Sequence, residues 1–243
     1  MGNVITNESS SKNLISIILP IYNEEEIIEG LLKNITGDLN YSKLKYEIII
    51  CENGSTDGTC GKLKEISNDN NSIKLLSLDS PSYGGAIKYG ISEATGDFAF
   101  IINADLWNIN FVNKSLFYLK KGSDIVIGSK TLKKSRDLRP FIRRFITKLF
   151  SIYLRLFFKY KGTDTHGLKG FKLDSVKDIA QRCRTVYELF DTELVLIAQA
   201  NGLKTKEIPV EIKEERPTKV KILLRVPKTL KELYYLHKSL KCV

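Results

Sequence analysis

Short apolar runs alternate with longer amphipathic stretches between Leu14 and about Gly128. The apolar runs are rich in β-branched side chains and too short for buried helices, so they predict strands. The predicted strands are Leu14 to Ile21, Tyr46 to Cys51, Ile73 to Leu78, Asp97 to Ile102 and Asp124 to Gly128. Helical spacing is found between them, at Glu24 to Ile35, Asp57 to Ser67, Gly84 to Ala94 and Asn110 to Leu119. This alternation indicates an α/β fold with a mainly parallel sheet flanked by helices.

The pattern changes after Gly128. Residues 138–160 combine aromatic, aliphatic and basic side chains, and the segment from Gly162 to Lys172 is polar and contains glycine, as a loop would. A helix is expected over Phe190 to Asn201, ended by Gly202. One or two strands around Pro209 follow within Lys204 to Ile212, and Pro227 opens a last amphipathic helix. We expect a disordered tail at 1–13, one domain over 14–221 and the C-terminal helix over 222–243.

Composition limits the class of protein. A chain of 243 residues with 42% hydrophobic and 27% charged residues is long enough for one domain with a real core. Its four cysteines have no C-x-x-C spacing, which indicates reduced thiols in a cytosolic protein, and two histidines argue against a zinc site. The polar N-terminus lacks the order of a signal peptide, so we expect the mature protein to be the whole chain.

The positive charge is concentrated in one stretch. Between Lys130 and Lys161 there are eleven basic residues and one acid, so this stretch alone has the net charge of +10 of the whole chain. Such a localised excess predicts an anionic partner, which is nucleic acid, phospholipid or a phosphorylated substrate.

Polar or glycine-containing segments follow four of the predicted strands: Pro20 to Glu24, Glu52 to Asp57, Asp79 to Gly85 and Asn103 to Asp105. Turn residues at strand ends explain one or two of these. Four together favour a nucleotide site, because ligands of parallel sheets bind at the carboxyl ends of strands. Asp105 is the predicted ligand of Mg²⁺ or Mn²⁺, which would neutralise a diphosphate. The alternative is a turn or helix N-cap carboxylate.

Four ordered motifs resemble those of glycosyltransferase family 2. They are Leu19-Pro20-Ile21-Tyr22-Asn23-Glu24, Glu52-Asn53-Gly54-Ser55-Thr56-Asp57-Gly58-Thr59, Gly84-Gly85-Ala86 with Gly90 and Ala94-Thr95-Gly96-Asp97, and Asn103-Ala104-Asp105-Leu106. Later segments resemble the dolichyl-phosphate mannose and glucose synthases of that family: Gly128-Ser129-Lys130, Asp164 to Phe171, Phe190 to Leu194, and Glu207 to Val210. Their order and spacing make the resemblance specific.

The resemblance implies a GT-A type fold, a nucleotide-sugar donor and inversion at the anomeric carbon. By position it implies a nucleotide-sugar site made of Pro20, Tyr22, Glu24, Glu52, Asn53, Ser55, Gly84, Gly85, Asn103, Ala104 and Asp105. Asp105 matches the second carboxylate of the D-x-D metal motif, and Asn103 is the other predicted ligand. The implied phosphate contacts are Lys130 and the late basic pair Arg216 and Lys219.

Three departures from the family pattern bear on activity. Asn103 replaces the first D-x-D aspartate, which removes a negative charge and weakens the expected hold on the metal. Glu52 and Asn53 replace a pair of aspartates, and Trp107 stands where some relatives have a polar side chain. A weakened or inactive enzyme is therefore one alternative.

The segment from Phe141 to Tyr160 is amphipathic. Arg144, Lys148, Arg155 and Lys159 recur along one helical face, and Phe141, Phe145, Leu149, Ile152, Leu156 and Tyr160 fill another. No apolar run approaches the ~20 residues that span a bilayer. We expect this helix to lie on an anionic membrane surface, with an ordinary surface helix as the alternative. The resemblance agrees, because polyprenyl-phosphate synthases have interface helices here.

A lipid phosphate acceptor needs no general base, because it is already anionic at pH 7. The expected residues at the acceptor phosphate and membrane are Lys130, Arg139, Arg143, Arg144, Lys148, His166, Lys169, Arg216 and Lys219. Catalytic candidates are Asp105, Lys130, Asp191, Glu193 and Arg216. Asp191 and Glu193 are carboxylates near the acceptor or, alternatively, acids in an exposed first helical turn.

The predicted function is transfer of glucose or mannose from a nucleotide diphosphate sugar to a polyprenyl or dolichyl phosphate at the cytosolic face of a membrane. The first alternative is a family 2 enzyme that glycosylates a saccharide hydroxyl. The second is a non-catalytic, membrane-docked subunit. Nucleic-acid binding is disfavoured, because the basic patch lacks the glycine-flanked aromatic motifs of RNA-binding modules. A membrane-protein subunit or a second copy of the chain stays open as a partner.

Overall fold

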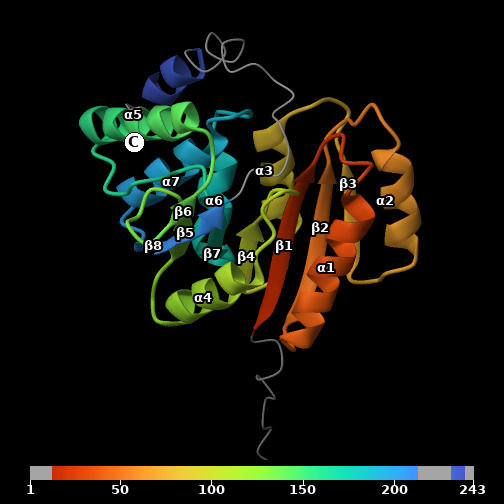
Figure 1. The fold of residues 1–243 in the computed structure, drawn as a ribbon. Helices are drawn as coiled ribbons and strands as arrows, with labels where there is room; N and C mark the ends of the chain where they lie inside the picture. Colours follow the sequence, from red (N-terminus) through yellow and green to blue (C-terminus); the bar gives the residue numbers. More distant parts are fainter. Residues whose placement is uncertain (1–12, 213–230, 239–243) are drawn as a thin grey trace, which may run out of the picture.

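The computed structural model describes residues 13–212 and 231–238. Its main sheet has seven strands within these residues. They are β1 (Leu14–Ile21), β2 (Lys45–Glu52), β3 (Ile73–Ser77), β4 (Phe98–Ile101), β5 (Ile125–Ser129), β7 (Lys169–Lys172) and β8 (Thr205–Pro209). Their spatial order is β3-β2-β1-β4-β7-β5-β8 (Figure 1). Strands β3, β2, β1 and β4 pair in parallel, as does β5 with β8, which confirms the predicted mainly parallel sheet.

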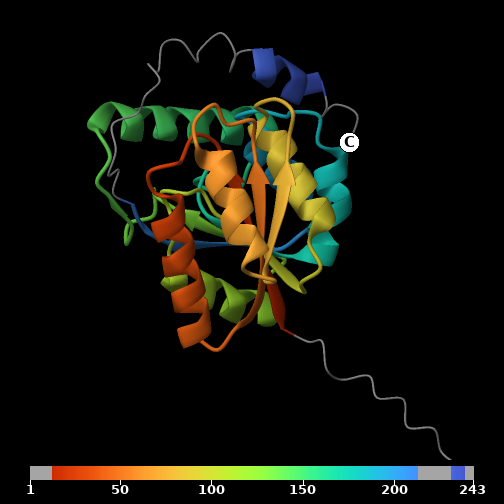
Figure 2. The same cartoon turned by 90° about the vertical axis from the view of Figure 1, so that its right-hand side faces the viewer.

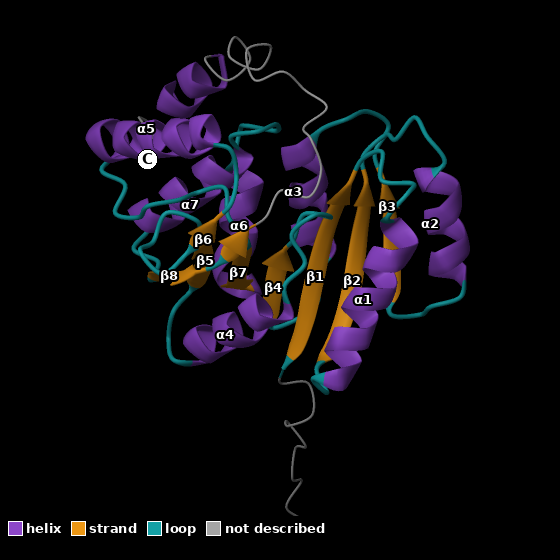
Figure 3. Ribbon diagram, viewed as in Figure 1, coloured by secondary structure: helices purple, strands orange, loops and turns teal. Residues whose placement is uncertain are grey.

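The strand β7 lies antiparallel between β4 and β5 (Figure 3). The predicted loop from Gly162 to Lys172 is therefore wrong for Lys169–Lys172. The segment Lys-Gly-Phe-Lys has no apolar run. Lys169 is nevertheless buried, and its ammonium forms an ion pair with Asp191. A Cβ atom on Gly170 would lie 2.5 Å from a ring carbon of Phe100, so only glycine allows this ring to pack against the strand.

Helices cover both faces of the sheet. On one face α1 (Ile28–Tyr41), α2 (Thr59–Asn68) and α4 (Ile109–Lys120) bury their apolar sides against one core. On the other face α3 (Tyr83–Glu93), α6 (Leu173–Arg182) and α7 (Phe190–Ala200) do the same (Figures 1 and 3). The first helix starts four residues later than predicted, because Glu25 to Ile27 form turns, and it ends six residues later. The helix α6 was not predicted, although Leu173, Val176 and Ile179 are buried at helical spacing.

The helix α5 (Phe141–Phe158) lies outside these layers, at the end of the molecule toward which β1 and β2 point (Figures 1 and 2). The strand β6 (Arg136–Asp137), which comes shortly before α5 in the sequence, pairs in parallel with β9 (Glu211–Ile212). Tyr160 was predicted on its apolar face, but the helix ends at Lys159 in a left-handed conformation. Tyr160 is buried instead, and its hydroxyl donates to the Asp164 carbonyl at 2.8 Å.

A helix over residues 231–238 packs beside α5 (Figures 1 and 2). The Tyr153 hydroxyl of α5 lies 2.7 Å from Nε2 of His237, and the Phe158 ring contacts the same imidazole. The predicted opening of this helix at Pro227 lies outside the described residues, as do residues 1–12 of the tail predicted at 1–13 and the predicted phosphate contacts Arg216 and Lys219.

Candidate functional site

The carboxyl ends of β1, β2 and β4 lie side by side, because these strands are parallel neighbours (Figure 1). In the register, Ile21 of β1 is level with Glu52 of β2. The segments that follow these strands therefore meet at one edge of the sheet, as the sequence predicts. Pro20 and Glu24 are partly buried at this edge, and Tyr22 is exposed.

The loop after β2 is held by its own polar side chains. Glu52 is buried, and its Oε1 accepts a hydrogen bond from the Ser55 amide at 2.6 Å. The Ser55 hydroxyl accepts in turn from the Asn23 amide at 3.0 Å, which ties this loop to the one after β1. Asn53 Oδ1 accepts from the Ser82 amide at 2.7 Å. These predicted nucleotide contacts thus fix the positions of three loops.

The N-terminus of α3 is covered by a neighbouring segment. The Val186 carbonyl accepts from the amides of Gly84 at 2.9 Å and Gly85 at 3.3 Å, and from the Ser82 hydroxyl at 2.8 Å. A Cβ atom on Gly84 would lie 2.6 Å from the Phe190 Cβ atom. The two glycines, predicted to bind the nucleotide, therefore allow the 186–190 segment to pack directly against α3.

Asn103, Ala104 and Asp105 follow β4 directly. Asp105 is exposed, and its carboxylate makes no hydrogen bond or ion pair with any described residue. Asn103 is half-buried, and its Oδ1 lies 3.1 Å from the Tyr83 hydroxyl of α3. The carboxylate is therefore open to solvent, whereas one atom of the Asn103 carboxamide contacts Tyr83.

A buried polar chain begins at Tyr83. Its hydroxyl also lies 3.1 Å from Asp191 Oδ2, and Asp191 Oδ1 lies 3.2 Å from Lys169 Nζ. Burial and the negative charge of Asp191 raise the pKa of Tyr83 well above its usual value, so the hydroxyl keeps its proton. Burial lowers the pKa of Lys169, while Asp191 acts in the opposite direction. Asp191 and Lys169 were predicted near the acceptor, and they pair with each other.

A second buried ion pair lies beside the first. Lys130 Nζ is 3.0 Å from Asp164 Oδ2, and both side chains are almost fully buried. Burial opposes ionisation of Asp164, but the charge and hydrogen bonds of Lys130 hold its pKa below the usual value. Burial lowers the pKa of His166, whose ring lies 5.5 Å from that of Phe150 in α5. Lys130 thus binds its own chain in this structure, where a phosphate contact was predicted.

Glu193 supports the loop before α7. Its Oε2 accepts from the amides of Arg184 at 2.9 Å and Thr185 at 2.6 Å, and from the Thr185 hydroxyl at 2.6 Å. Glu193 is fully buried and Asp191 almost fully. Their burial excludes the alternative that they are acids in an exposed helical turn.

Comparisons with known proteins identify the family. Residues 16–180 match the family model described as Glycosyl transferase family 2. The chain belongs to glycosyl transferase family 2. It is 29% identical over 227 residues to a dolichyl-phosphate beta-glucosyltransferase of Trichomonas vaginalis, covering 86% of this chain and 68% of that protein. It is 33% identical over 136 residues to the dolichol-phosphate mannosyltransferase of Pyrococcus furiosus, covering 55% and 38%.

Solved structures share the GT-A fold of this family 2 chain. The mannosyltransferase PcManGT from Pyrobaculum calidifontis, in complex with GDP-Man and Mn²⁺, gives a TM-score of 0.62 at 19% identity, over 89% of this chain and 61% of that one. Glucosyl-3-phosphoglycerate synthase from Mycobacterium tuberculosis, in complex with Mn²⁺ and UDP-Glc, gives 0.64 at 18% identity, over 90% and 76%. These likenesses confirm the predicted fold class.

The oxygen ligands of the 103–105 loop fit a divalent cation only in part. Within residues 13–212 and 231–238, no group of three or more His, Cys, Asp or Glu side chains could hold a metal ion. Mg²⁺ is commonly bound by one or two carboxylates together with substrate phosphates and water. Asp105 and Asn103 are therefore sufficient if a diphosphate supplies further ligands, and binding should depend on the nucleotide.

The surface of α5 in this family 2 protein is mainly apolar. Eight large side chains are between 42% and 77% exposed: Phe141, Ile142, Phe145, Ile146, Leu149, Ile152, Leu156 and Phe157. Arg144 and Lys148 are exposed beside them, whereas Arg143 is half-buried and Arg139 forms a two-pronged ion pair with Asp137. No helix in the described part of the chain is long and apolar enough to cross a membrane.

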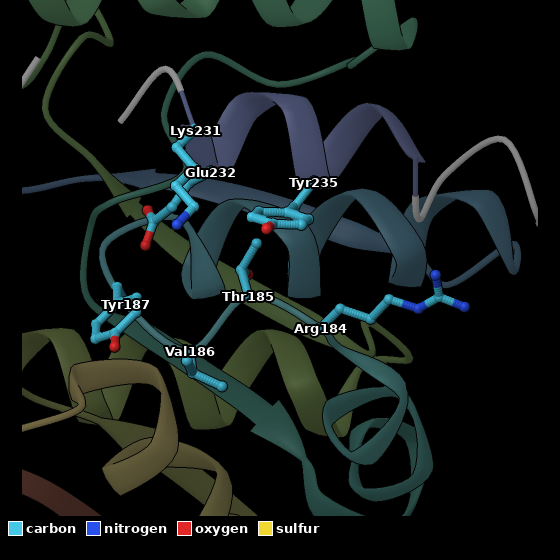
Figure 4. Close-up of a pocket in the computed structure, with 7 residues that line it drawn as sticks. All are labelled: Arg184, Thr185, Val186, Tyr187, Lys231, Glu232 and Tyr235. Atoms are coloured by element: carbon cyan, nitrogen blue, oxygen red, sulfur yellow. The ribbon is translucent and has the colours of Figure 1, made fainter. Parts of the chain in front are cut away.

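A pocket of about 430 Å³ lies between the 184–187 segment and the helix over 231–238 (Figure 4). Its lining residues are Arg184, Thr185, Val186, Tyr187, Lys231, Glu232 and Tyr235. Val186 connects it to the amides of α3, and Glu232 Oε2 accepts from the Leu189 amide at 3.0 Å. The pocket is thus next to the segment that covers α3, and Asp105 is not among its lining residues.

Tyr83 is the residue of this site that the sequence analysis missed. It directly precedes Gly84, but an aromatic residue before two glycines gives no signal of a polar contact. The signal that could have found it is the strand-end rule, since the segment from Asp79 to Gly85 was already among the candidates.

Proposed function

We propose that this family 2 glycosyltransferase transfers glucose or mannose from a nucleoside diphosphate sugar to a polyprenyl or dolichyl phosphate on a membrane surface. One observation carries the proposal: α5, whose exposed side is apolar, lies at the end of the molecule toward which β1 and β2 point, where the candidate donor loops follow these strands (Figure 1). Several relatives are named dolichyl-phosphate glucosyltransferases or mannosyltransferases, which supports this acceptor class.

The reaction proposed is a single displacement. A phosphate oxygen of the lipid forms a bond to the anomeric carbon, and the bond from that carbon to the diphosphate breaks with its electron pair. The nucleoside diphosphate leaves, and the configuration inverts. A phosphate acceptor is already ionised at neutral pH, so no side chain has to remove a proton.

A divalent cation, when bound, would neutralise the charge that develops on the departing diphosphate. Asp105 would hold it with its exposed carboxylate, and Asn103 is the second oxygen ligand in reach of the same loop. The loops after β1 and β2 would receive the nucleoside, because Asn53, Ser55 and Glu52 keep them in place.

The geometry of α5 supports contact with a lipid surface. At about 100° per residue, the exposed apolar side chains fall on the side opposite the buried residues Ser151 and Leu154 and the partly buried Thr147. Arg144, Lys148 and Arg155 form a stripe between these two sides. A helix with this arrangement can insert its apolar face at the boundary of the acyl chains, while basic residues meet anionic headgroups. The cysteine pattern supports the cytosolic side of that membrane.

A saccharide hydroxyl as acceptor is less well supported. It requires a general base, and Asp191 and Glu193 were the candidates. Asp191 pairs with Lys169 and Tyr83, and Glu193 holds Arg184 and Thr185. If either were the base, kcat would fall on an acid limb that disappears in Asp191→Asn or Glu193→Gln. A positioning role would lower kcat equally at every pH.

The proposal is tested by a donor screen. The protein is incubated with polyprenyl phosphate in vesicles, Mg²⁺ or Mn²⁺, and a panel of UDP and GDP hexoses. Formation of a lipid-linked hexose identifies sugar, base and acceptor together, and EDTA should abolish it. Mn²⁺ binding with UDP or GDP but no transfer to any polyprenyl phosphate would contradict the acceptor. No Mn²⁺ binding with either nucleotide would favour a non-catalytic subunit.

A further inference from the structure

The Tyr83 hydroxyl has one proton and two neighbouring oxygen positions. Asn103 Oδ1 and Asp191 Oδ2 each lie 3.1 Å from it. A carboxylate is the stronger acceptor, because charge-assisted hydrogen bonds are about twice as strong as neutral ones. The proton of Tyr83 is therefore directed to Asp191, and the contact with Asn103 has to be satisfied in another way.

The carboxamide of Asn103 can satisfy it as a donor. An amide has two N–H groups on one side and a carbonyl oxygen on the other, and which side faces a neighbour follows from the hydrogen-bond network. With Nδ2 toward the phenol, the amide donates to the Tyr83 oxygen. The carbonyl oxygen of Asn103 then faces the opposite way, out of the buried chain.

We propose that Tyr83 is a positioning residue for the metal loop: by donating to Asp191 and accepting from Asn103, it turns the carbonyl oxygen of Asn103 toward the cation that Asp105 would hold. This inference rests on the metal-dependent part of the proposed function. It assigns a role in the reaction to a hydroxyl that itself touches neither cation nor substrate.

The row of hydrogen-bonded side chains that runs from Asn103 through Tyr83 to Asp191 ends at Lys169. The ammonium of Lys169 lies 3.2 Å from Asp191 Oδ1 and donates to the Gly167 carbonyl at 2.9 Å, and its side chain is 1% exposed. Asp191 therefore has its charge offset and its orientation fixed. The hydrogen bond to Asp191 orients the Tyr83 hydroxyl, and the contact with Tyr83 orients the carboxamide of Asn103.

The same chain explains why asparagine fits at position 103. An ionised aspartate has no proton to donate to the phenol oxygen, so it would compete with Asp191 for the single proton of Tyr83. It would also place a second negative charge near Asp191, with Lys169 as the cation of the chain. The carboxamide keeps an oxygen for the metal and keeps the buried chain neutral.

The test is a double-mutant cycle on Mn²⁺ affinity. Mn²⁺ binding is measured by calorimetry in saturating UDP or GDP, whichever binds, for the full chain and for Tyr83→Phe, Asn103→Ala and the double variant. Tyr83→Phe should weaken Mn²⁺ binding about fivefold, the loss expected for one neutral hydrogen bond. Asn103→Ala should weaken it at least as much. In the Asn103→Ala background, Tyr83→Phe should have no further effect.

Tyr89→Phe is the matched control, because Tyr89 is on the same helix and is exposed. Urea unfolding of each variant measures stability separately from Mn²⁺ affinity. Equal weakening by Tyr83→Phe in both backgrounds, or an unchanged affinity in Asn103→Ala, overturns the inference. If the unsubstituted protein transfers the sugar and the cycle shows no coupling, the inference fails alone. If it binds no Mn²⁺ with nucleotide, the metal-dependent function fails as well.

Discussion

The buried ion pairs at the sheet edge and the outer face of α5 differ in whether their side chains have partners within the described residues. At the sheet edge, charged groups are buried, and each has a partner within the described chain: Lys169 with Asp191, and Lys130 with Asp164. On α5, eight large apolar side chains remain between 42% and 77% exposed in the described part of the chain. Buried charge is expensive unless paired, and a contiguous exposed apolar face marks an interaction site.

The contrast shows where an external partner is needed. The buried ion pairs need no external partner, because the ammonium and the carboxylate of each pair neutralise one another. The face of α5 has no such explanation within the described residues. Four variants, three single and one double, test the sheet edge and the face of α5, and they are ordered by the expected effect.

The largest effect is expected for Lys169→Met, which leaves Asp191 buried and unpaired. Breaking a buried pair costs about 3–5 kcal/mol of unfolding free energy. Lys172→Met is the control, because Lys172 is on the same strand and forms a part-exposed pair with Asp124 at 3.2 Å. That change should cost at most about 1 kcal/mol. Urea unfolding compares them, and equal losses would refute the distinction. Adding Asp191→Asn to Lys169→Met should restore part of the stability.

Asp105→Asn should reduce transfer about a hundredfold or more, since a catalytic cation supplies several kcal/mol. Its unfolding free energy should stay within about 0.5 kcal/mol, because the side chain is exposed and makes no contact. Steady-state kinetics and urea unfolding measure the two quantities. Asp69→Asn, at an exposed helix end, is the control for the loss of one surface charge. Full activity in Asp105→Asn would exclude this carboxylate as metal ligand.

Replacing Phe145 and Leu149 together with glutamine should weaken binding to anionic vesicles between about tenfold and a hundredfold. Full burial of each side chain contributes about 1.5–3 kcal/mol, and the headgroup region buries them in part. Phe117→Gln is the matched control, because Phe117 is 52% exposed on α4 and Phe145 is 50% exposed on α5. Vesicle sedimentation reports binding. The membrane assignment fails if both proteins bind alike and as tightly as the unsubstituted chain.

The smallest effect is expected for Arg144→Gln. One basic residue near an anionic surface contributes about 1 kcal/mol, so vesicle affinity should fall about fivefold at low salt. The difference should shrink as the salt concentration rises, because screening shortens the range of the interaction. Lys120→Gln, at the exposed end of α4, should change nothing. A loss that persists at high salt would point to packing instead of charge.

Much of the fold follows from the sequence, because parallel strands that are buried on both faces are continuous apolar runs. Leu14–Ile21 was predicted to the residue, and the other four strands predicted before Gly128 differ by one residue at one or both ends. The strand Lys169–Lys172 could not be predicted, since its burial depends on Asp191, a partner remote in the sequence. Local pattern carries no information about such a pair.

The candidate site shows the same limit. The strand-end segments and Asp105 could be placed from the sequence, because topology alone brings them to one edge. The sequence does not tell whether a lysine faces solvent or pairs with an aspartate, and Lys130, which pairs with Asp164, is an example. On α5, the helical pattern predicted an apolar face, but only the structure shows that this face points outward.

The position of β7 has a consequence for how the chain folds during synthesis. The strand β4 ends at Ile101, and β5 ends at Ser129, yet neither can join the other until residues 169–172 have emerged from the ribosome. Until then each presents an unpaired edge on which another chain could add. The two halves of the sheet thus stay separate until this segment has been made, and a chain truncated before it would be prone to aggregate.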